Sequence, residues 1–328
     1  MTAQTMRAVV VTAHGDPDVL QVQDVPVPEV GPTQVLVEVA ASGVNFIDVY
    51  RRQGVYPTDP PFVLGMECAG RVLATGAGVD SVSVGDVVAT AEAGNGTHAA
   101  LAVFEAATAV PVPASVAPDI AAGAMLQGIT AHYLTNSTFP VQPGNEVLVH
   151  AAGGGVGQLL VQLAKTKGAH VVATVGSAEK EQVARSAGAD EVIRYDEVSE
   201  LADAVRAASG GGVHVVYDGV GKATFDASLA SLRPRGTLAL FGGASGQVPP
   251  FDLQRLNSGG SLFVTRPTIV HHVATRDELT WRTCELFAAI ADDSLHIAIG
   301  GRYPMERAAD AYRDLEGRRT TGKLLIVP

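Results

Sequence analysis

Hydrophobic positions change their spacing near residue 146. Before that point, short valine-rich segments are interrupted every ten or so residues by glycine and proline. These segments predict β-strands at 7–11, 19–25, 35–44, 70–75, 85–91 and 101–104, with one short helix after Gly43. Several short strands with turn signals between them are typical of a small antiparallel, barrel-like domain.

From Glu146 onward, buried strands alternate with helices. Strands are predicted at 147–150, 170–175, 191–194, 212–217, 237–241 and 261–265, and the first three helices at 156–167, 177–187 and 198–208. Such alternation is typical of βαβ units, which build a parallel, doubly wound sheet. Helices are also expected over most of 271–299 and at 304–315, before a last strand at 323–327 that returns to the first domain. The predicted fold class is α/β.

A glycine turn follows the first strand of this array, in Ala151-Ala-Gly-Gly-Gly-Val-Gly157. Such a turn lets a pyrophosphate approach the backbone and meet the positive end of the next helix. The first glycine of the usual Gly-x-Gly-x-x-Gly pattern is replaced by Ala152. Gly154 and Gly157 keep the close-approach and helix-packing roles. Because the turn follows a predicted strand and opens a helix, it predicts a dinucleotide site.

The end of the second strand indicates which dinucleotide binds. NAD sites usually carry Asp or Glu there to bind the ribose hydroxyls. This chain instead has Thr174-Val-Gly-Ser177, with no acid until Glu179 and with Lys180 on the first turn of the next helix. Tyr195 closes the third strand. A small neutral strand end beside a cation suits a 2′-phosphate, so NADPH is predicted over NADH. Spacing alone would favour a solvated surface lysine at position 180, and it is the missing acid that favours the 2′-phosphate.

Composition narrows the class of protein. The formal net charge is −11 with both signs interspersed, which argues against a nucleic-acid or anionic-membrane partner. The two cysteines, Cys68 and Cys284, have no paired spacing, so neither a disulfide framework nor a cysteine zinc site is expected. No run approaches the roughly 20 apolar residues of a membrane span, and the first residues do not form a signal peptide. A cytoplasmic protein is therefore expected.

Polar residues gather in the segment Gly43–Pro57. Asn45 and Asp48 can each cap the short helix, and Tyr50 and Tyr56 fall in the same patch. On the residues alone, a capping asparagine and partly buried tyrosines account for this pattern, because polar residues are routine at caps and turns.

Several motifs together identify a family. They are Gly43-Val-Asn-Phe-Ile-Asp-Val-Tyr50, Gly65-Met-Glu-Cys-Ala-Gly70, Gly85-Asp-Val-Val88, His150-Ala-Ala-Gly-Gly-Gly-Val-Gly157, Thr174-Val-Gly-Ser-Ala-Glu-Lys180, Val216-Tyr-Asp-Gly-Val-Gly221 and Val264-Thr-Arg-Pro267. Over essentially its whole length the chain resembles the zinc-free medium-chain dehydrogenase/reductase proteins, specifically the NADPH:quinone oxidoreductase (zeta-crystallin-like) group and most closely its bacterial members. The resemblance implies a β-rich GroES-like catalytic domain at 1–128 and 270–328, and a Rossmann NADPH-binding domain at 129–269. It also implies substrate binding in the cleft between the domains, and a homodimer.

The resemblance also bears on metal binding. Zinc-dependent alcohol dehydrogenases of the superfamily hold catalytic zinc through Cys, His and a second Cys or Glu. The corresponding positions here are Asn45 or its neighbour, Met66, and the neighbourhood of Leu126-Gln127. These do not form a plausible set of three converging zinc ligands. The cysteine-rich lobe of the structural zinc is missing as well, so no metal is expected.

The resemblance further implies the cofactor contacts. Most lie at the glycine turn and beyond the strand ends, where ligands of parallel sheets bind, and a second group lies on the short helix of the first half. The full set is Phe46, Ile47, Asp48, Tyr50, Tyr133, Gly154, Gly155, Val156, Gly157, Gly176, Ser177, Lys180, Tyr195, Gly219, Phe241, Gly242, Val264, Thr265, Arg266 and Arg318. Arg319 is the alternative to Arg318.

The expected activity is NADPH-dependent reduction of a quinone, by hydride or one-electron transfer. Without a metal the acceptor oxygen needs a hydrogen-bond donor, and Asn45, Tyr50 and Tyr56 are the catalytic candidates, with Gln127 at the edge. Two alternatives stay open. One is reduction of an enal, enone or enoyl thioester, with Tyr50 or Tyr56 supplying a proton. The other is a weakly catalytic NADPH-binding protein with a structural or RNA-binding role.

Overall fold

The computed structural model describes residues 4–328, which divide into two compact units. Unit 1 comprises the residues up to Leu126 together with Thr275–Pro328, and unit 2 comprises Gln127–Ala274. Unit 2 is therefore inserted in the sequence of unit 1. The first boundary falls inside one continuous helix, α2 (Pro118–Tyr133).

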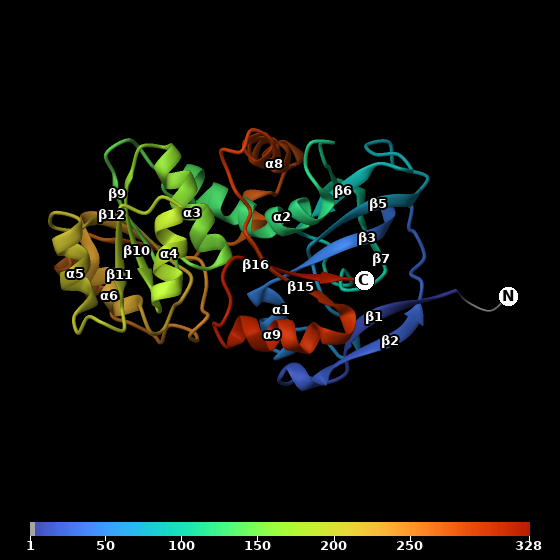
Figure 1. Ribbon diagram of the computed structural model, residues 1–328, viewed down its shortest axis with the longest axis horizontal. Helices are drawn as coiled ribbons and strands as arrows, with labels where there is room; N and C mark the ends of the chain where they lie inside the picture. The colour runs from blue at the N-terminus through green and yellow to red at the C-terminus, as the bar shows by residue number, and fades with distance from the viewer. Residues whose placement is uncertain (1–3) are drawn as a thin grey trace. The chain divides into compact units, whose positions relative to one another are not determined.

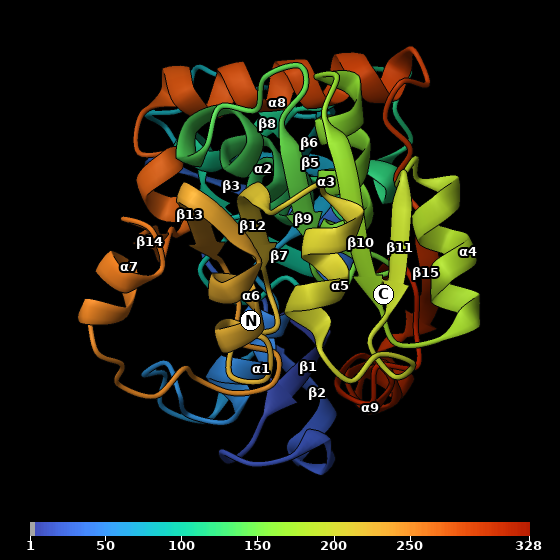
Figure 2. The same ribbon diagram turned by 90° about the vertical axis from the view of Figure 1, so that its left-hand side faces the viewer.

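Unit 2 is built on a six-stranded sheet in the order β11-β10-β9-β12-β13-β14 (Figures 1 and 2). All its ladders are parallel. The chain runs outward from β9 through β10 to β11 and then crosses back to β12, so β9 and β12 meet at a topological switch point. The strands are β9 (Glu146–Val149), β10 (His170–Val175), β11 (Glu191–Arg194), β12 (Val213–Asp218), β13 (Leu232–Leu240) and β14 (Phe263–Thr265).

Helices connect these strands and bury the sheet. α3 contacts α4 and α5 contacts α6, as expected when the two pairs cover opposite faces of a doubly wound sheet. The core includes Leu148, Val172, Val216 and Leu238, none with exposed surface. The predicted alternation of strands and helices is confirmed. The helices are α3 (Gly155–Thr166), α4 (Ala178–Ser186), α5 (Leu201–Ala208), α6 (Phe225–Ser231) and α7 (Gln254–Ser258), with short turns at Leu134–Thr138 (π) and Ile269–His272 (3₁₀).

Unit 1 contains two sheets, one ordered β2-β1-β4 and the other β15-β16-β3-β5-β6-β8 with β7 also paired to β3. β16 pairs antiparallel with β3, placing Leu325 opposite Gly43. The predicted return of the last strand is therefore confirmed. The strands are β1 (Thr5–Val11), β2 (Leu20–Pro26), β3 (Gln34–Val44), β4 (Phe62–Val63), β5 (Cys68–Thr75), β6 (Val87–Thr90), β7 (Leu101–Glu105), β8 (Val110–Pro111), β15 (Ile299–Pro304) and β16 (Lys323–Val327).

The described part of unit 1 contains four helices, two of which, α1 (Phe46–Arg52) and α9 (Ala308–Glu316), pack on a core that includes Val49, Leu64, Tyr312 and Ile326. The others are α2 and α8 (Arg276–Ala291), and 3₁₀ turns lie at Pro17–Val19, Ala106–Thr108 and Met305–Arg307. None of the helices within residues 4–328 is long and apolar enough to cross a membrane.

One predicted helix in the C-terminal part starts too early. The helix expected from residue 304 begins at Ala308, because residue 304 ends β15, which pairs in parallel with β16, and residues 305–307 form a 3₁₀ turn. Local hydrophobic spacing does not encode that pairing. The helical structure expected over most of 271–299 is present chiefly as α8, which ends at Ala291, shortly before Asp293 takes a left-handed φ of 61°.

Candidate cofactor and active site

The glycine turn between β9 and α3 packs backbone against backbone. A Cβ on Gly157 would overlap the Ala151 carbonyl oxygen and lie 2.7 Å from Ala152 Cα. Ala151 itself has a left-handed φ of 52°, and Gly154 is the N-cap of α3. The free N–H groups at the start of α3 thus follow a turn without bulky side chains, which is the arrangement that binds a pyrophosphate.

The predicted cofactor residues beyond the strand ends lie close to one another. Gly219 follows β12, and Phe241 and Gly242 follow β13. A Cβ on Gly242 would lie 2.9 Å from Gly219 Cα, and a Cβ on Gly219 would lie 2.9 Å from the Phe241 ring. At the next strand end, Arg266 donates to the Leu240 carbonyl at 3.1 Å. The carboxyl ends of β12, β13 and β14 are therefore drawn together.

Asp218 anchors this edge of the sheet, a role that the sequence analysis missed. One carboxylate oxygen accepts the N–H groups of Val220 at 2.8 Å and Gly221 at 3.0 Å. The other accepts the hydroxyls of Thr224 at 2.7 Å and Ser228 at 2.8 Å. The loop that carries Gly219 is thereby fixed. An aspartate that ends an apolar strand is the sequence signal that identifies such an anchor.

A buried histidine extends this anchor to the glycine turn. His150 Nε2 contacts Ser228 Oγ at 3.0 Å, and its Nδ1 contacts Thr174 Oγ1 at 2.8 Å. Burial lowers the pKa of His150, partly offset by the carboxylate of Asp218. A neutral imidazole therefore links the ends of β9 and β10 with α6, which is a structural role for His150.

Lys180 and Tyr195, the two residues predicted to lie near the 2′-phosphate, pack against backbone at the carboxyl end of the unit 2 sheet. Ser177 is the N-cap of α4 and accepts the Lys180 N–H at 3.3 Å. A Cβ on Gly153 would lie 2.9 Å from Lys180 Cβ and 3.0 Å from its Cγ, so the lysine stem crosses the glycine turn. A Cβ on Gly176 would overlap the Tyr195 hydroxyl. A cation and a hydroxyl thus flank the neutral end of β10.

Two other predicted contacts, and the alternative to one of them, have different surroundings. Tyr133 is buried and stacks on the His272 ring at a centroid distance of 4.2 Å and an interplanar angle of 3°. Arg318 follows α9 with a left-handed φ of 54° and is exposed. The alternative, Arg319, pairs with Asp314 at 2.9 Å.

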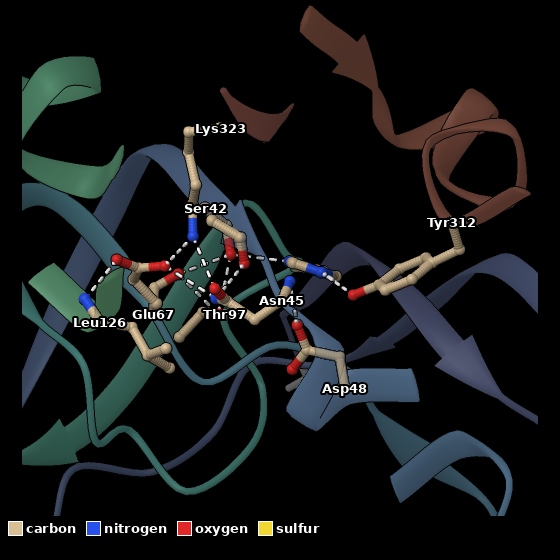
Figure 3. A network of polar contacts seen from close by, with 10 residues as sticks. Ser42, Asn45, Asp48, Glu67, Thr97, Leu126, Tyr312 and Lys323 are labelled. Atoms are coloured by element: carbon tan, nitrogen blue, oxygen red, sulfur yellow. Dashed lines mark hydrogen bonds and ion pairs between the residues drawn. The ribbon is translucent and has the colours of Figure 1, made fainter. Parts of the chain in front are cut away.

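In unit 1 a buried polar network surrounds the start of α1 (Figure 3). Asn45, only 3% exposed, is the N-cap of the helix. Its amide nitrogen donates to Gly43 O at 3.2 Å and to Glu67 Oε2 at 2.8 Å, and its oxygen accepts from Lys323 Nζ at 2.7 Å. Both amide hydrogens are therefore engaged within the network.

A buried ion pair lies at the centre of the network. Lys323 Nζ is 2.5 Å from Glu67 Oε2, with side-chain exposures of 1% and 0%. The second carboxylate oxygen of Glu67 accepts the Leu126 N–H at 2.6 Å. This pair was not predicted from the sequence, although each charge stands alone in an otherwise apolar stretch, which is a signal for a buried partner.

The two candidate tyrosines are more accessible than Asn45. Tyr50 is partly exposed in the middle of α1, and Tyr56 in the following loop is 43% exposed. Their rings meet edge-on at 5.9 Å, and the Tyr50 ring lies 6.4 Å from that of Phe46. Two phenolic hydroxyls and an apolar ring are thus clustered on and beside one helix of unit 1.

Comparison with known proteins identifies the family of this chain. Residues 31–114 match the family described as "Alcohol dehydrogenase GroES-like domain", and residues 155–287 match "Zinc-binding dehydrogenase". A mycobacterial protein solved in complex with NADPH is 49% identical, with a TM-score of 0.95 over 98% of this chain and 100% of the other. The Escherichia coli quinone oxidoreductase solved with NADPH is 39% identical, with a TM-score of 0.96 over 98% and 100%. The 2-haloacrylate reductase of a Burkholderia species is 39% identical over 98% of each chain.

The chain belongs to the medium-chain dehydrogenase/reductase family. Its fold is accordingly the GroES-like domain combined with a Rossmann-like nucleotide-binding domain, as predicted. Like its relatives of this family it is an oxidoreductase.

The name of one matched family implies zinc, which the residues of this chain do not fit. Lys323 brings its own positive charge to Asn45 and Glu67, where a second cation would be repelled. Met66 offers a thioether, a poor ligand for zinc. Within residues 4–328 no group of three or more His, Cys, Asp and Glu side chains is arranged to hold a metal ion.

Proposed function

We propose that this medium-chain dehydrogenase/reductase protein is an NADPH-dependent quinone oxidoreductase that works without a metal. The cofactor is NADPH. The observation that carries the choice of NADPH is that Lys180 and Tyr195 flank the neutral end of β10. Lys180 packs on Gly153, and Tyr195 packs on Gly176. The support for a quinone acceptor is the similarity to quinone oxidoreductases over nearly the whole chain.

The proposed cofactor contacts in unit 2 bind different parts of NADPH. NADPH supplies the reducing equivalents when bound. The glycine turn and the N-terminus of α3 receive the pyrophosphate, and Lys180 with Tyr195 receives the 2′-phosphate. Gly219 lies in the loop that Asp218 fixes, and Arg266 ties the end of β14 to the end of β13. Gly219, Gly242 and Thr265 at these strand ends are the further contacts that we propose.

The proposed role of unit 1 is to bind the acceptor oxygen. A donor fixed near a developing negative charge contributes on the order of 10²-fold in rate. Tyr50 and Tyr56 are better placed for this than Asn45, because both are more exposed than Asn45, which lies within the buried network. We therefore assign the donor role to the tyrosines and a supporting role to Asn45.

A panel of acceptors tests the assignment. NADPH oxidation is followed with naphthoquinones, ortho-quinones, alkenals, enones and an enoyl thioester, and the variants Tyr50→Phe and Tyr56→Phe serve as controls for the donor. We expect turnover of quinones at the highest kcat/KM for the acceptor, reduced in at least one variant when NADPH is saturating. Turnover of alkenals alone would refute the quinone assignment.

A second candidate function is reduction of a carbon–carbon double bond conjugated to a carbonyl group. The observation in its favour is the similarity to a 2-haloacrylate reductase at 39% identity over 98% of both chains. The same tyrosines would then supply the proton. A weakly catalytic structural or RNA-binding role is the third alternative, and NADPH binding without turnover of any acceptor would support it.

We further propose that two copies of the chain pair through the β14 edge of the unit 2 sheet. β14 is an outermost strand, and Phe263 on it is 60% exposed, with Leu253 at 68% and Val270 at 54% nearby in sequence. An exposed apolar edge strand is a pairing surface. The mass in solution, measured by sedimentation equilibrium, tests this.

The free thiols Cys68 and Cys284 support a reducing compartment such as the cytoplasm.

A further inference from the structure

Asp48 is a carboxyl group with no exposed surface at the start of α1. It occupies the third position of the helix, and its Oδ2 accepts the Asn45 N–H at 2.9 Å (Figure 3). Its Oδ1 makes no hydrogen bond of normal geometry within residues 4–328. Because its side chain is enclosed, Asp48 acts on the site only through its neighbours.

A chain of polar groups begins beside Asp48. The Tyr312 hydroxyl lies near enough to the carboxyl to lower its pKa and contacts His98 Nε2 at 2.7 Å. His98 Nδ1 contacts Ser42 Oγ at 2.6 Å, and Ser42 Oγ also contacts Thr97 and the Glu67 carbonyl, both at 2.8 Å. All of these side chains are buried.

The hydrogen bonds along this row of polar groups can adapt to either protonation state of Asp48. With Asp48 ionised, Tyr312 donates toward the carboxylate and the His98 Nε2–H donates to Tyr312. With Asp48 protonated, its O–H donates to Tyr312, which in turn donates to His98 Nε2 while Nδ1–H donates to Ser42. His98 stays neutral in both cases, since burial lowers its pKa to about 3. A neutral imidazole can take either tautomer.

Several charges act on Asp48 from the elements packed around it. Burial raises its pKa to about 7, opposed by the Asn45 N–H, by Tyr312 on α9, by Lys323 on β16 and by Arg51 on α1. The positive charge of Lys323 is itself compensated by Glu67 on β5.

Arg52 on α1 is also buried, and its Nη2 forms an ion pair with Glu316 Oε1 on α9 at 2.8 Å. Arg51 donates to Asn95 Oδ1 at 2.6 Å. The cations around α1 therefore each have another partner, and Asp48 remains the one buried carboxyl of the network without an ion pair in the described residues.

We propose that Asp48 is a positioning residue for the acceptor step, which fixes the first turn of α1, and with it Tyr50, most firmly when Asp48 is ionised. The proposal rests on the proposed donor role of Tyr50, two residues further along the helix. An ionised side chain accepts the Asn45 N–H more strongly than a neutral one, and it also complements the positive end of the helix.

The test is the pH profile of Asp48→Asn beside that of the wild type. Asparagine keeps the size and an acceptor for the Asn45 N–H but stays neutral, so it mimics the protonated state. We expect the wild-type/variant ratio of kcat for acceptor reduction to rise about fivefold through a single ionisation between about pH 6 and pH 8, centred near the Asp48 pKa of about 7. The profiles are recorded at saturating NADPH, so that kcat does not report cofactor affinity.

A second variant separates positioning from simple loss of structure. Tyr312→Phe removes the hydroxyl that lowers the pKa of Asp48, so the midpoint of the profile should move to higher pH. Asp16→Asn is the matched control, because Asp16 caps an exposed turn by accepting the Asp18 N–H at 3.0 Å; its profile should equal that of the wild type. A ratio that is constant with pH in Asp48→Asn, or an unmoved midpoint in Tyr312→Phe, would overturn the proposal.

Infrared difference spectroscopy gives a readout that does not depend on turnover. The carbonyl stretch of a protonated carboxylic acid should appear in wild type as the pH falls through 7 and be absent from Asp48→Asn. If that band titrates but the wild type reduces no acceptor, the proposed function is wrong although Asp48 ionises as expected. If acceptors are reduced and the band is missing, the positioning role fails alone.

Discussion

Glu67 and Lys323 illustrate how much a single residue matters where charge is buried. Both side chains are almost fully enclosed and meet at 2.5 Å, so each charge has exchanged water for its partner. Breaking such a pair costs about 3–5 kcal/mol, because the remaining charge is left uncompensated. We expect Lys323→Met to lower the free energy of unfolding by about that amount in urea titrations.

The double variant Lys323→Met/Glu67→Gln is the informative companion, since it removes the charge that the single substitution leaves alone. It should regain part of the lost stability. Arg7→Ala is the control for a generic ion pair. Arg7 and Glu306 are both about half exposed, and exposed pairs contribute about 0–1 kcal/mol. Equal losses in Lys323→Met and Arg7→Ala would contradict the argument.

Lys180 carries the prediction on cofactor choice. Its stem lies across Gly153 at the start of the nucleotide edge, where its ammonium group can pair with a 2′-phosphate. We expect Lys180→Ala to weaken NADPH binding about tenfold, the loss of one charge-assisted contact, and to leave NADH binding unchanged. Fluorescence titration measures both. Arg185→Ala removes a cation from the same helix, where Arg185 pairs with Glu181, and should alter neither; equal weakening of both cofactors by Lys180→Ala would contradict the role.

Residues differ in how far sequence alone could place them. Lys180 could be proposed as a cofactor contact from sequence because an acid is missing only a few positions away, at the end of β10. Glu67 and Lys323 are 256 positions apart, and no local pattern states that β3 brings β5 and β16 together. The same distance kept the engagement of Asn45 by Lys323 out of view, although Asn45 itself was recognised as a helix cap.

At the scale of elements, the β9–turn–α3 unit was predictable because its strand, its glycines and its helix are adjacent in sequence. The packing of the turn gives a sharp test. A Cβ on Gly157 would overlap the Ala151 carbonyl oxygen, whereas a Cβ on Gly154 would lie 3.3 Å from that oxygen with no closer neighbour. We expect Gly157→Ala to weaken NADPH binding by at least about tenfold and to lower the melting temperature.

Gly154→Ala is the matched control for that substitution. Gly154 has φ −82° and ψ 172°, a conformation open to any residue, so the variant should keep the melting temperature of the wild type. Scanning calorimetry of both variants provides the comparison. If the two lower the melting temperature equally, the shape of the turn does not depend on close packing at Gly157.

β15 shows where prediction of elements failed. Residues 299–304 have no regular hydrophobic period, and Pro304 suggested the start of a helix. The segment becomes a strand because it pairs with β16, about 20 positions further on. Pairing partners decide such short segments, and single-sequence patterns do not name the partner.

At the scale of the whole molecule, the two-part unit 1 was predictable because the sheet-forming pattern resumes after residue 323. The boundaries were harder to place: residues 128/129 and 269/270 were expected, and contacts divide the chain at 126/127 and 274/275. The first lies within α2, which runs unbroken from Pro118 to Tyr133. A continuous helix gives no break in composition or spacing by which sequence could mark a boundary.

The stability of the whole molecule should also report the buried carboxyl of Asp48. Its pKa is raised from 3.8 to about 7 in the folded chain, so between these values the folded state holds a proton that the unfolded state has released. The free energy of unfolding therefore falls as pH rises through this window, by on the order of 4 kcal/mol. Subtracting the unfolding free energy of Asp48→Asn at each pH isolates this contribution, because His98 and the other titrating groups are common to both chains. The difference in unfolding free energy, wild type minus variant, should be largest near pH 4, decline steadily toward pH 7 and level off above it. Urea titrations across this range measure that difference. A constant difference would show that Asp48 is ionised as readily in the folded chain as in the unfolded one.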